Sequence, residues 1–259
     1  MSIDTAVNVK QQVRDLLKSL ETGDPKPAAV IHPGKYIQHN LAVGDGVAGL
    51  LAVLKVAPPI QVKTVRVFQD ADFVFAHTEY DFFGPKIGFD IFRFEQGQIV
   101  EHWDNLQETP TQPNPSGHTM TDGATVATDL HQTAANKRLV RAFVDDILVG
   151  GQMARLAQYF EGDSYVQHNP QVADGLSGLG RALEAWAKQG IAMKYDRVHQ
   201  VLGEGDFVLV VSEGALAGRH TSFYDLFRVE KGRIAEHWDT IEAIPPQSEW
   251  KNQNGKFGF

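Results

Sequence analysis

The chain has 259 residues, of which 42% are hydrophobic and 10% aromatic, and its formal net charge is −8 at pH 7. This length and composition fit a globular protein with room for two domains of ordinary size and argue against disorder. No nucleic-acid partner is expected, because there is no basic run and binding that polyanion begins with clustered Lys and Arg. The absence of cysteine excludes thiol nucleophiles, disulfides and thiolate metal sites.

The first twenty residues predict an amphipathic helix, with a possible N-terminal cap at Asp4. They lack the basic start, apolar core and small-residue cleavage site of a signal peptide, so we expect a cytoplasmic protein. No stretch approaches the 18 apolar residues of a membrane-spanning helix, so no membrane association is expected. The apolar residues at helical spacing are Val9, Val13, Leu16, Leu17 and Leu20.

Two motifs occur twice in the same order. YIQHN at 36–40 returns as YVQHN at 165–169, and DIFRFEQGQIVEHWD at 90–104 returns as DLFRVEKGRIAEHWD at 225–239. Ordered matches of this length are not a chance event and indicate an internal repeat. We therefore predict two tandem copies of one domain. Copy one covers residues 1–118 and copy two residues 127–259, with 119–126 as the linker. The segment 109–129 around the linker is rich in Pro, Thr and Gly and is expected to be a linker or a wrapping tail.

Each copy is predicted to place its helices before its strands. In copy two the helical segments are 136–149, 153–160 and 176–189, and the alternating segments are 195–200, 207–212, 222–230 and 233–242. Helices followed by an antiparallel meander indicate an α+β fold in which the helices pack on one face of the sheet.

This order of elements, with YxQHN and a final hairpin of the form DxFRxExGxIxEHWD, resembles the SnoaL-like polyketide cyclases of the nuclear transport factor 2-like superfamily. Ketosteroid isomerase shares that fold. The resemblance covers nearly all of each copy and implies a curved, mostly antiparallel sheet wrapped round N-terminal helices. Such a domain forms a cone with a ligand pocket inside. In the cyclases an Asp near the end of the last strand is the acid/base, and Asp104 and Asp239 match it here. The cyclases have a His partner where this sequence has Asp90 and Asp225.

The residues themselves point to the same hairpin. Asp90 alternates with Phe92 and Phe94 and so shares their strand face. Burial there would raise its pKa and suit it to proton transfer, whereas the alternative is an Asp that bonds backbone amides at a strand start. The Asp that closes each EHWD motif could instead begin a turn, and the His before it could be structural. The catalytic candidates are Asp104, Asp239, Asp90, Asp225, His102 and His237.

Further polar and aromatic residues are candidates for substrate binding. The His-Asn pairs of the YxQHN motifs could lie at the pocket mouth or cap the next helix through Asn or Asp45. Trp103 and Trp238 occupy the opposite strand face and are expected to pack against another domain. Glu101 and Glu236 share that face and are expected to be solvated or paired with arginine. The substrate-binding candidates are His39, Asn40, His168, Asn169, Phe92, Phe94, Tyr36 and Tyr165.

The turn of the copy-one hairpin can be interpreted in two ways. A two-residue Gln96-Gly97 loop would set Asp90 opposite Trp103. A three-residue loop beginning at Glu95 would set Asp90 opposite His102 and gather Asp90, Phe92, Phe94, Val100, His102 and Asp104 on one face. We predict the three-residue loop in both copies, with 230–232 as the loop of copy two.

The predicted function is cofactor-independent enolisation of a small apolar carbonyl compound, by an isomerase, a cyclase or an aldol-type lyase. The alternative is a non-catalytic module that binds a small molecule. His39, Asp90, His102 and Asp104 offer nitrogen and oxygen donors, but their spacing matches no metal motif, so neither a metal nor a cofactor is expected. The two copies are expected to pair through their sheets, with Trp103 or Trp238 near the contact, and a homodimer is possible.

Overall fold

The computed structural model describes residues 8–259, so Asp4 lies outside the described part. The first helix, α1 (Val9–Thr22), begins after Asn8, whose side chain accepts a hydrogen bond from the Gln11 backbone N–H at 3.1 Å. It ends at Gly23, which adopts the left-handed conformation that favours glycine. Val13, Leu16 and Leu17 are buried, which confirms the predicted amphipathic helix. No helix in residues 8–259 is long and apolar enough to cross a membrane.

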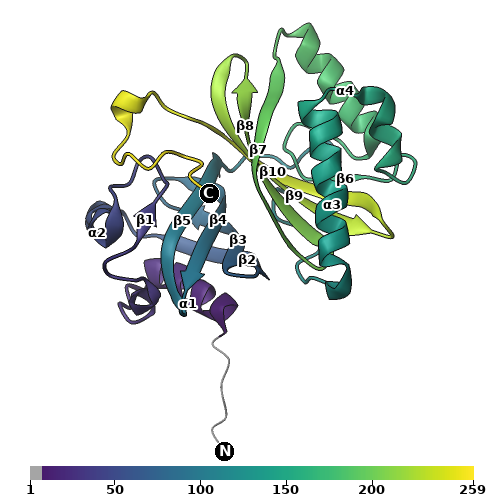
Figure 1. The fold of residues 1–259 in the computed structure, drawn as a ribbon. Helices are drawn as coiled ribbons and strands as arrows, with labels where there is room; N and C mark the ends of the chain where they lie inside the picture. The colour runs from purple at the N-terminus through teal and green to yellow at the C-terminus, as the bar shows by residue number, and fades with distance from the viewer. Residues whose placement is uncertain (1–7) are drawn as a thin grey trace, which may run out of the picture.

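Each half of the chain contains helices and one five-stranded sheet, which confirms the α+β class (Figure 1). The strand orders are β1-β5-β4-β3-β2 and β6-β10-β9-β8-β7, so the topology of copy one recurs in copy two. In both sheets the short first strand is parallel to its neighbour and the other pairs are antiparallel. Each short strand lies inside a YxQHN motif, so this motif forms the parallel edge beside the EHWD strand.

The remaining elements of copy one are η1 (Pro27–Val30), β1 (Ile37–Gln38), α2 (Gly46–Val56), β2 (Gln61–Asp70), β3 (Phe73–Asp81), β4 (Pro85–Glu95) and β5 (Gln98–Glu108). Those of copy two are η2 (Leu130–Gln132), α3 (Thr133–Phe143), η3 (Val144–Val149), η4 (Met153–Gln158), β6 (Val166–Gln167), α4 (Gly175–Lys188), β7 (Met193–Glu204), β8 (Phe207–Leu216), β9 (Arg219–Glu230), β10 (Arg233–Ala243) and η5 (Gln247–Glu249).

One face of each sheet packs against the helices of its own copy. In copy one, Val13 and Leu17 of α1 belong to a buried cluster with Val74 and Phe92 of the sheet. In copy two, Phe143 at the end of α3 packs edge-on against Phe227 of β9, with ring centroids 5.5 Å apart. These inner clusters are where each copy buries its own apolar surface.

The opposite faces of the two sheets share a third apolar cluster. Phe68 of β2 stacks on Phe207 of β8 with ring centroids 4.5 Å apart, and both tryptophans of the EHWD motifs are buried in this cluster. Aromatic side chains therefore supply much of the contact between the two sheets. The cluster comprises Phe68, Phe75, Phe89, Ile91, Trp103, Leu202, Phe207, Leu209, Val211, Tyr224, Leu226 and Trp238.

An irregular arm leaves each sheet and crosses to the other copy. The first arm, residues 109–126, places Asn114 so that its amide donates to the carbonyl oxygens of Gln167 (2.6 Å) and Val172 (3.0 Å). The second arm, residues 244–259, places Asn252 against the carbonyl oxygens of Asn40 (2.8 Å) and Val43 (2.9 Å). Each arm thus binds the YxQHN motif of the other copy and the loop that follows it. Residues 119–126, the predicted linker, lie in the first arm.

Arg66 of β2, a fully buried residue, holds the first arm in place. Its guanidinium donates to the backbone oxygens of Thr121 (3.0 Å), Asp122 (2.5 Å) and Ala124 (2.7 Å). It also lies 4.3 Å from the ring centroid of Trp238, a cation–π contact between the copies. Burial lowers the pKa of Arg66 to about 10, so the side chain remains a cation at neutral pH. A charged donor therefore satisfies three arm carbonyls at once.

We predict that Asn252→Ala lowers the free energy of unfolding by about 1–3 kcal/mol, because two carbonyl oxygens of copy one lose their donor. Urea unfolding of the whole chain measures the change. The neighbouring Gln253, which is exposed, supplies the control Gln253→Ala with no loss expected. Equal stability of the two variants would show that the arm does not hold copy one.

Candidate functional site

The final hairpin of each copy closes with a two-residue turn. Gln96 and Gly97 have φ values of 50° and 80°, and Lys231 and Gly232 have φ values of 50° and 72°. Glu95 pairs directly with Gln98, and Glu230 with Arg233. The predicted three-residue loop is therefore wrong in both copies. Positive φ at both central residues is the geometry whose twist matches that of the flanking strands.

A β-bulge one step from each turn then changes the register. The register shifts between Arg93 and Phe94, which leaves Val100 as the extra residue, and Ala235 is the extra residue of copy two. Beyond the bulge Asp90 pairs with Asp104, and not with His102 as predicted. Asp225 likewise pairs with Asp239.

The bulge also determines which side chains face inward. Ile99 packs in the inner cluster with Phe92 and Phe94, so the predicted inward position of Val100 is wrong. Asp90, Phe92, His102 and Asp104 do share one face and line one cavity. The turn is one residue shorter than predicted, and the bulge adds one residue to the second strand. Beyond the bulge the side chains therefore face the predicted sides of the sheet, although their cross-strand partners differ from the prediction.

This copy-one cavity has a volume of about 120 Å³. Its walls are mostly apolar side chains from α1, α2 and the sheet. The polar lining residues include Tyr36, Gln38, Asn40, Asp90, His102 and Asp104, which we call the polar wall, and Tyr80 and Lys86 also line the cavity. The copy-two cavity is smaller, at about 60 Å³, and repeats this polar wall with Tyr165, Gln167, Asn169, Asp225, His237 and Asp239.

The Asp that ends each EHWD motif is held by one oxygen only. Asn40 donates from its amide to Asp104 Oδ2 at 2.6 Å, and Asn169 donates to Asp239 Oδ2 at 2.7 Å. The Oδ1 atoms of Asp104 and Asp239 are buried and have no hydrogen-bond partner within residues 8–259. A buried acceptor without a donor is costly, which makes this repeated feature a candidate for function. Each cavity thus contains an oriented carboxyl group with one free oxygen.

The second Asp of each cavity belongs to a hydrogen-bond chain. Asp90 Oδ1 lies 3.2 Å from His102 Nε2, and His102 Nδ1 lies 3.0 Å from Gln38 Oε1. The amide of Gln38 donates to the Tyr36 hydroxyl at 3.1 Å, which fixes Gln38 Oε1 as an acceptor toward His102. His102 Nδ1 therefore carries the hydrogen that it donates to Gln38 Oε1, and His102 Nε2 faces Asp90. Copy two repeats the chain, with 3.0 Å from His237 Nε2 to Asp225 Oδ1.

A tyrosine that sequence reasoning missed completes each chain. The Tyr80 hydroxyl donates to Asp90 Oδ2 at 2.7 Å, and the Tyr195 hydroxyl lies 3.2 Å from Asp225 Oδ2. Tyr80 lies on β3 and Tyr195 on β7, which is the counterpart of β2. The two tyrosines do not align, so the repeat could not reveal them. Gln38 and Gln167 were also missed, although their place inside a repeated motif was a usable signal.

Burial changes the acidity of the copy-two cluster. Burial and the nearby charge of Asp225 raise the pKa of Asp239 to about 6, against the opposing effects of His237 and the Asn169 hydrogen bond. Burial lowers the pKa of His237, but its hydrogen bond to Asp225 and the charges of both carboxylates outweigh burial and raise it. Burial also raises the pKa of Tyr165 well above its usual range. The carboxyl group of Asp239 therefore exchanges its proton near neutral pH.

The copy-one cluster differs by a cation from the second arm. Lys256 is buried, and its Nζ lies 2.6 Å from Glu242 Oε2 and 3.8 Å from Asp104 Oδ1. Burial opposes the charge on Lys256, but the carboxylates of Glu242 and Asp104 outweigh it and raise the pKa. Within residues 8–259 no Lys or Arg forms an ion pair with Asp239. The two cavities therefore share a polar wall but differ in charge.

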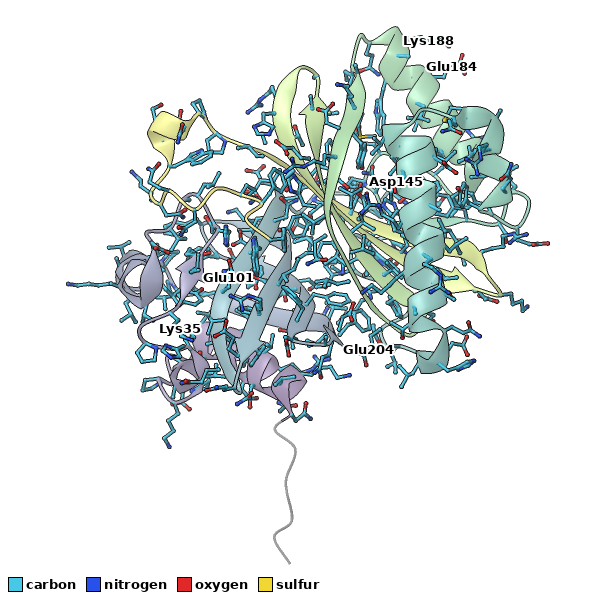
Figure 2. The ribbon with its side chains drawn as sticks, in the orientation of Figure 1. Lys35, Glu101, Asp145, Glu184, Lys188 and Glu204 are labelled. Carbon is cyan, nitrogen blue, oxygen red and sulfur yellow. The ribbon has the colours of Figure 1, made fainter. Side chains whose placement is uncertain are left out.

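The structure corrects three of the predicted substrate-binding residues. His39 and His168 do not line the cavities, because neighbouring residues of an extended strand point to opposite faces. His39 Nε2 bonds Glu101 Oε1 at 2.9 Å, and its ring stacks on Trp103 (Glu101 is labelled in Figure 2). His168 bonds Glu236 in the same way and stacks on Trp238. Phe94 lies in the inner core and not at the cavity wall, whereas Phe92 lines it.

Glu101 and Glu236, on the outer face of each sheet, were expected to be either solvated or paired with arginine. The structure shows that both are paired with arginine. Arg93 donates to Glu101 Oε2 and Arg228 to Glu236 Oε2, each at 2.7 Å. Burial raises the pKa of each Glu, but the hydrogen bonds from His and Arg outweigh burial and lower it. The same Glu thus joins an Arg of its own sheet to the buried His of the YxQHN motif.

Each cavity also brings three possible metal ligands together. Ligand atoms of Asp90, His102 and Asp104 lie within 4.8 Å of one another, as do those of the copy-two counterparts. Both ring nitrogens of His102 already have hydrogen-bond partners, Gln38 and Asp90. An ion bound here would have to replace one of these hydrogen bonds.

Comparison with known proteins identifies a domain within copy two. Residues 140–237 match the family model of the SnoaL-like domain. No curated protein matches the chain. Among solved structures the chain is similar to TsrD from Streptomyces laurentii, with 22% identity over 38% of this chain and 87% of that one and a TM-score of 0.34.

Two further solved structures are similar in the same way. IdmH from Streptomyces antibioticus, provisionally assigned as a polyketide cyclase, shares 17% identity over 39% of this chain and 92% of its own, with a TM-score of 0.35. A protein from Kribbella flavida, provisionally assigned as a ketosteroid isomerase, shares 19% identity over 44% of this chain and 84% of its own, with a TM-score of 0.36.

We predict that Asn169→Ala raises the pKa of Asp239 further above about 6, because the amide hydrogen bond favours the ionised carboxylate. A ¹³C NMR titration of the aspartate carboxyl carbons measures the shift. Gln253→Ala, at an exposed site in the second arm, is the control and should leave the titration unchanged. An Asp239 midpoint that falls or stays constant in Asn169→Ala would contradict the assignment of this hydrogen bond.

Proposed function

We propose that the chain catalyses cofactor-independent enolisation of a small apolar carbonyl compound, with Asp104 and Asp239 as the bases. The observation that carries this proposal is the Oδ1 of the same Asp in both cavities, which accepts no hydrogen bond within residues 8–259, beside an amide that holds the other oxygen. An oriented carboxylate in an apolar cavity is a suitable base for a proton next to a carbonyl group. The match of residues 140–237 to the SnoaL-like domain agrees with such chemistry.

A hydrogen-bond donor for the developing enolate is available in each polar wall. The Tyr36 hydroxyl accepts from Gln38 and forms no other hydrogen bond within residues 8–259, so its own hydrogen is free to point at a ligand oxygen. Burial, reinforced by the charges of Asp104 and Asp90, raises the pKa of Tyr36. The hydroxyl therefore stays protonated and can stabilise an enolate by donation. Tyr165 occupies the same position in copy two.

The proposed step moves one proton and two electron pairs. The free oxygen of Asp104 or Asp239 takes a proton from the carbon next to the substrate carbonyl. The electrons of that C–H bond form the enolate C=C bond, and the carbonyl π electrons move to the oxygen that faces Tyr36 or Tyr165. Return of the proton to another carbon isomerises the substrate. Attack of the enolate carbon on a second carbonyl group forms a C–C bond instead.

The cavity size limits the substrate. A cavity of about 150 Å³ holds benzene, so the copy-one cavity of about 120 Å³ fits a molecule of roughly that size. The copy-two cavity, at about 60 Å³, must widen before it admits a similar molecule. Cyclopentanone, a small ketone with exchangeable α-hydrogens, is a suitable probe for both.

The second candidate is a binding module without catalysis. The same Tyr and Asn groups could orient a bound carbonyl compound and do nothing more. The free carboxyl oxygen favours the enzyme, because binding of a carbonyl oxygen calls for donors and not for another acceptor. Binding of cyclopentanone without exchange of its α-hydrogens would support the module.

We predict that Asp104→Asn and Asp239→Asn each remove the exchange due to their own cavity, and that the double variant loses at least about 100-fold. Loss of α-hydrogen from cyclopentanone in deuterium oxide, followed by NMR, measures the rate. Each variant keeps the side-chain shape, so the free energy of unfolding should change by no more than about 1 kcal/mol. Exchange that survives in the double variant would show that other groups are the bases.

We predict that the exchange remaining in Asp104→Asn rises with pH and reaches half its maximum near pH 6, since Asp239 accepts a proton only when ionised. Rates at closely spaced pH values on either side of this midpoint measure the profile, with the double variant as the blank. A profile that falls as pH rises would exclude Asp239 as the base.

A further inference from the structure

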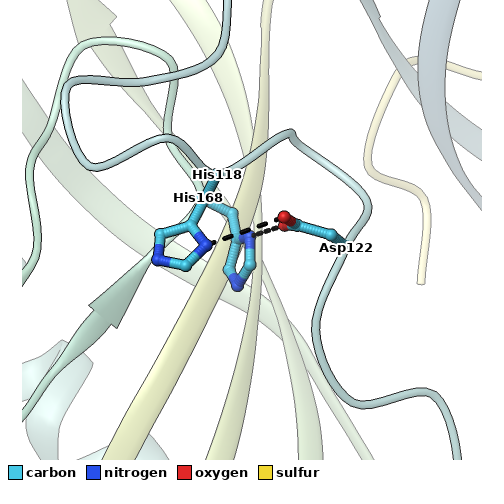
Figure 3. A group of neighbouring side chains, drawn as sticks. All are labelled: His118, Asp122 and His168. Atoms are coloured by element: carbon cyan, nitrogen blue, oxygen red, sulfur yellow. Dashed lines mark ion pairs between the residues drawn. The ribbon is translucent and has the colours of Figure 1, made fainter.

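Three side chains meet outside both cavities, where the first arm lies on copy two (Figure 3). His168 Nδ1 lies 2.6 Å from Asp122 Oδ1, and His118 Nδ1 lies 3.6 Å from Asp122 Oδ2. Their ligand atoms all lie within 4.8 Å of one another. We propose that His118, Asp122 and His168 bind one divalent transition-metal ion of the zinc type.

Both imidazoles are oriented as metal ligands are. His118 Nε2 lies 3.1 Å from Asp174 Oδ2, and His168 Nε2 lies 2.9 Å from Glu236 Oε1. A carboxylate accepts the hydrogen on each Nε2, so an ion at Nδ1 would take the place of the hydrogen that His168 Nδ1 donates to the Thr119 carbonyl oxygen at 2.9 Å. Both Nδ1 atoms face Asp122. A carboxylate behind each imidazole is the usual support for histidines that bind zinc.

Water would supply the fourth ligand. The Thr119 carbonyl oxygen accepts a hydrogen bond from His168 Nδ1 at 2.9 Å, and the ion would replace this hydrogen bond. Two imidazole nitrogens with a carboxylate and a water molecule suit Zn²⁺, which takes four ligands in a tetrahedron. Bonds of about 2.1 Å place such ligands about 3.4 Å apart. Asp122 would therefore withdraw slightly from His168, and its side chain is 43% exposed and free to do so.

Copy one provides an internal comparison. His39 has the same contacts as His168, with Glu101 at Nε2, a carbonyl oxygen of the crossing arm at Nδ1 and a stacked tryptophan. The second arm reads Asn252 to Lys256 where the first reads Asn114 to His118, so Lys256 stands in place of the second histidine. Within residues 8–259 no carboxylate of the second arm pairs with His39. The site is therefore specific to copy two, and one ion per chain is expected.

A bound ion would join the first arm to copy two. His118 and Asp122 belong to the arm, and His168 lies just after β6. An ion that binds only the folded chain adds to its stability by mass action. The site is partly open to solvent, since the His118 side chain is 30% exposed, whereas His168 is buried. The ion can thus enter without unfolding of the sheet.

Zinc titration of the whole chain tests the proposal. The protein is treated with a chelator, dialysed and titrated with zinc chloride by calorimetry, and its melting temperature is recorded with and without zinc. We expect one zinc per chain and a higher melting temperature with zinc. His118→Ala and Asp122→Asn should each weaken binding at least about 10-fold, and Asp174→Asn, which removes support from His118, about 10- to 100-fold. His131→Ala, at an exposed histidine, is the control and should bind as the unaltered chain does.

Two results would overturn the proposal. One is no zinc binding by the unaltered chain, which would leave the three residues as an ion-pair cluster; Asp122→Asn would then change the melting temperature equally with and without zinc. The other is zinc binding that survives the double variant His118→Ala/Asp122→Asn. The variant Asp104→Asn/Asp239→Asn should bind zinc normally, and loss of zinc there would place the ion in the cavities. Zinc binding and exchange of ketone α-hydrogens are thus measured independently, so failure of one proposal does not decide the other.

Discussion

The structure of each cavity depends on two carboxyl groups that face each other across one antiparallel strand pair. Asp90 pairs with Asp104, and Asp225 with Asp239. Partners of this kind have Cα atoms about 4.5–5.5 Å apart, and in copy two burial and the nearby charge of Asp225 raise the pKa of Asp239 to about 6. The surrounding groups follow from that constraint. In copy one, Tyr80 and His102 form hydrogen bonds with the first Asp, Asp90. Asn40 donates a hydrogen bond to one oxygen of the second, Asp104. What remains in each cavity is one carboxyl oxygen that accepts no hydrogen bond within residues 8–259, and it is the best candidate for chemistry.

The sequence predicts the strand faces of this site better than its register. Alternation along DIFRFE and EHWD places Asp90 and His102 on the inner face and Trp103 on the outer face, as the structure shows. The register was predicted wrongly because it depends on a bulge at Val100, an ordinary β-branched residue whose identity does not mark a bulge. Two local deviations cancelled, so the face was right although the cross-strand partners were wrong. Periodicity records which face a residue takes, whereas register depends on turn and bulge together.

Contacts between distant segments account for the rest of what the sequence could not predict. His39 and His168 follow a tyrosine and a glutamine that do line the cavities, but alternation turns both histidines outward against Trp103 and Trp238. Tyr80 and Tyr195 reach equivalent aspartates from strands that are not counterparts, so comparison of the repeats cannot align them. The arms have no periodicity, and their binding sites are backbone carbonyl oxygens, which carry no sequence signal. Repeats predict what two copies share and miss what joins them.

The arms show what covalent duplication permits. In a symmetric homodimer the two crossing arms would be identical, and so would the two sites that they complete. Here each arm has an Asn that binds the corresponding backbone of the opposite copy, Asn114 in the first arm and Asn252 in the second. The residues that follow this Asn differ between the two arms. One continues to His118 and Asp122 beside His168, and the other to Lys256 beside Asp104. The sheet and polar wall stay the same while the charge next to each copy changes. A difference in sequence between two short irregular arms is therefore enough to place different charged groups beside two domains of the same fold.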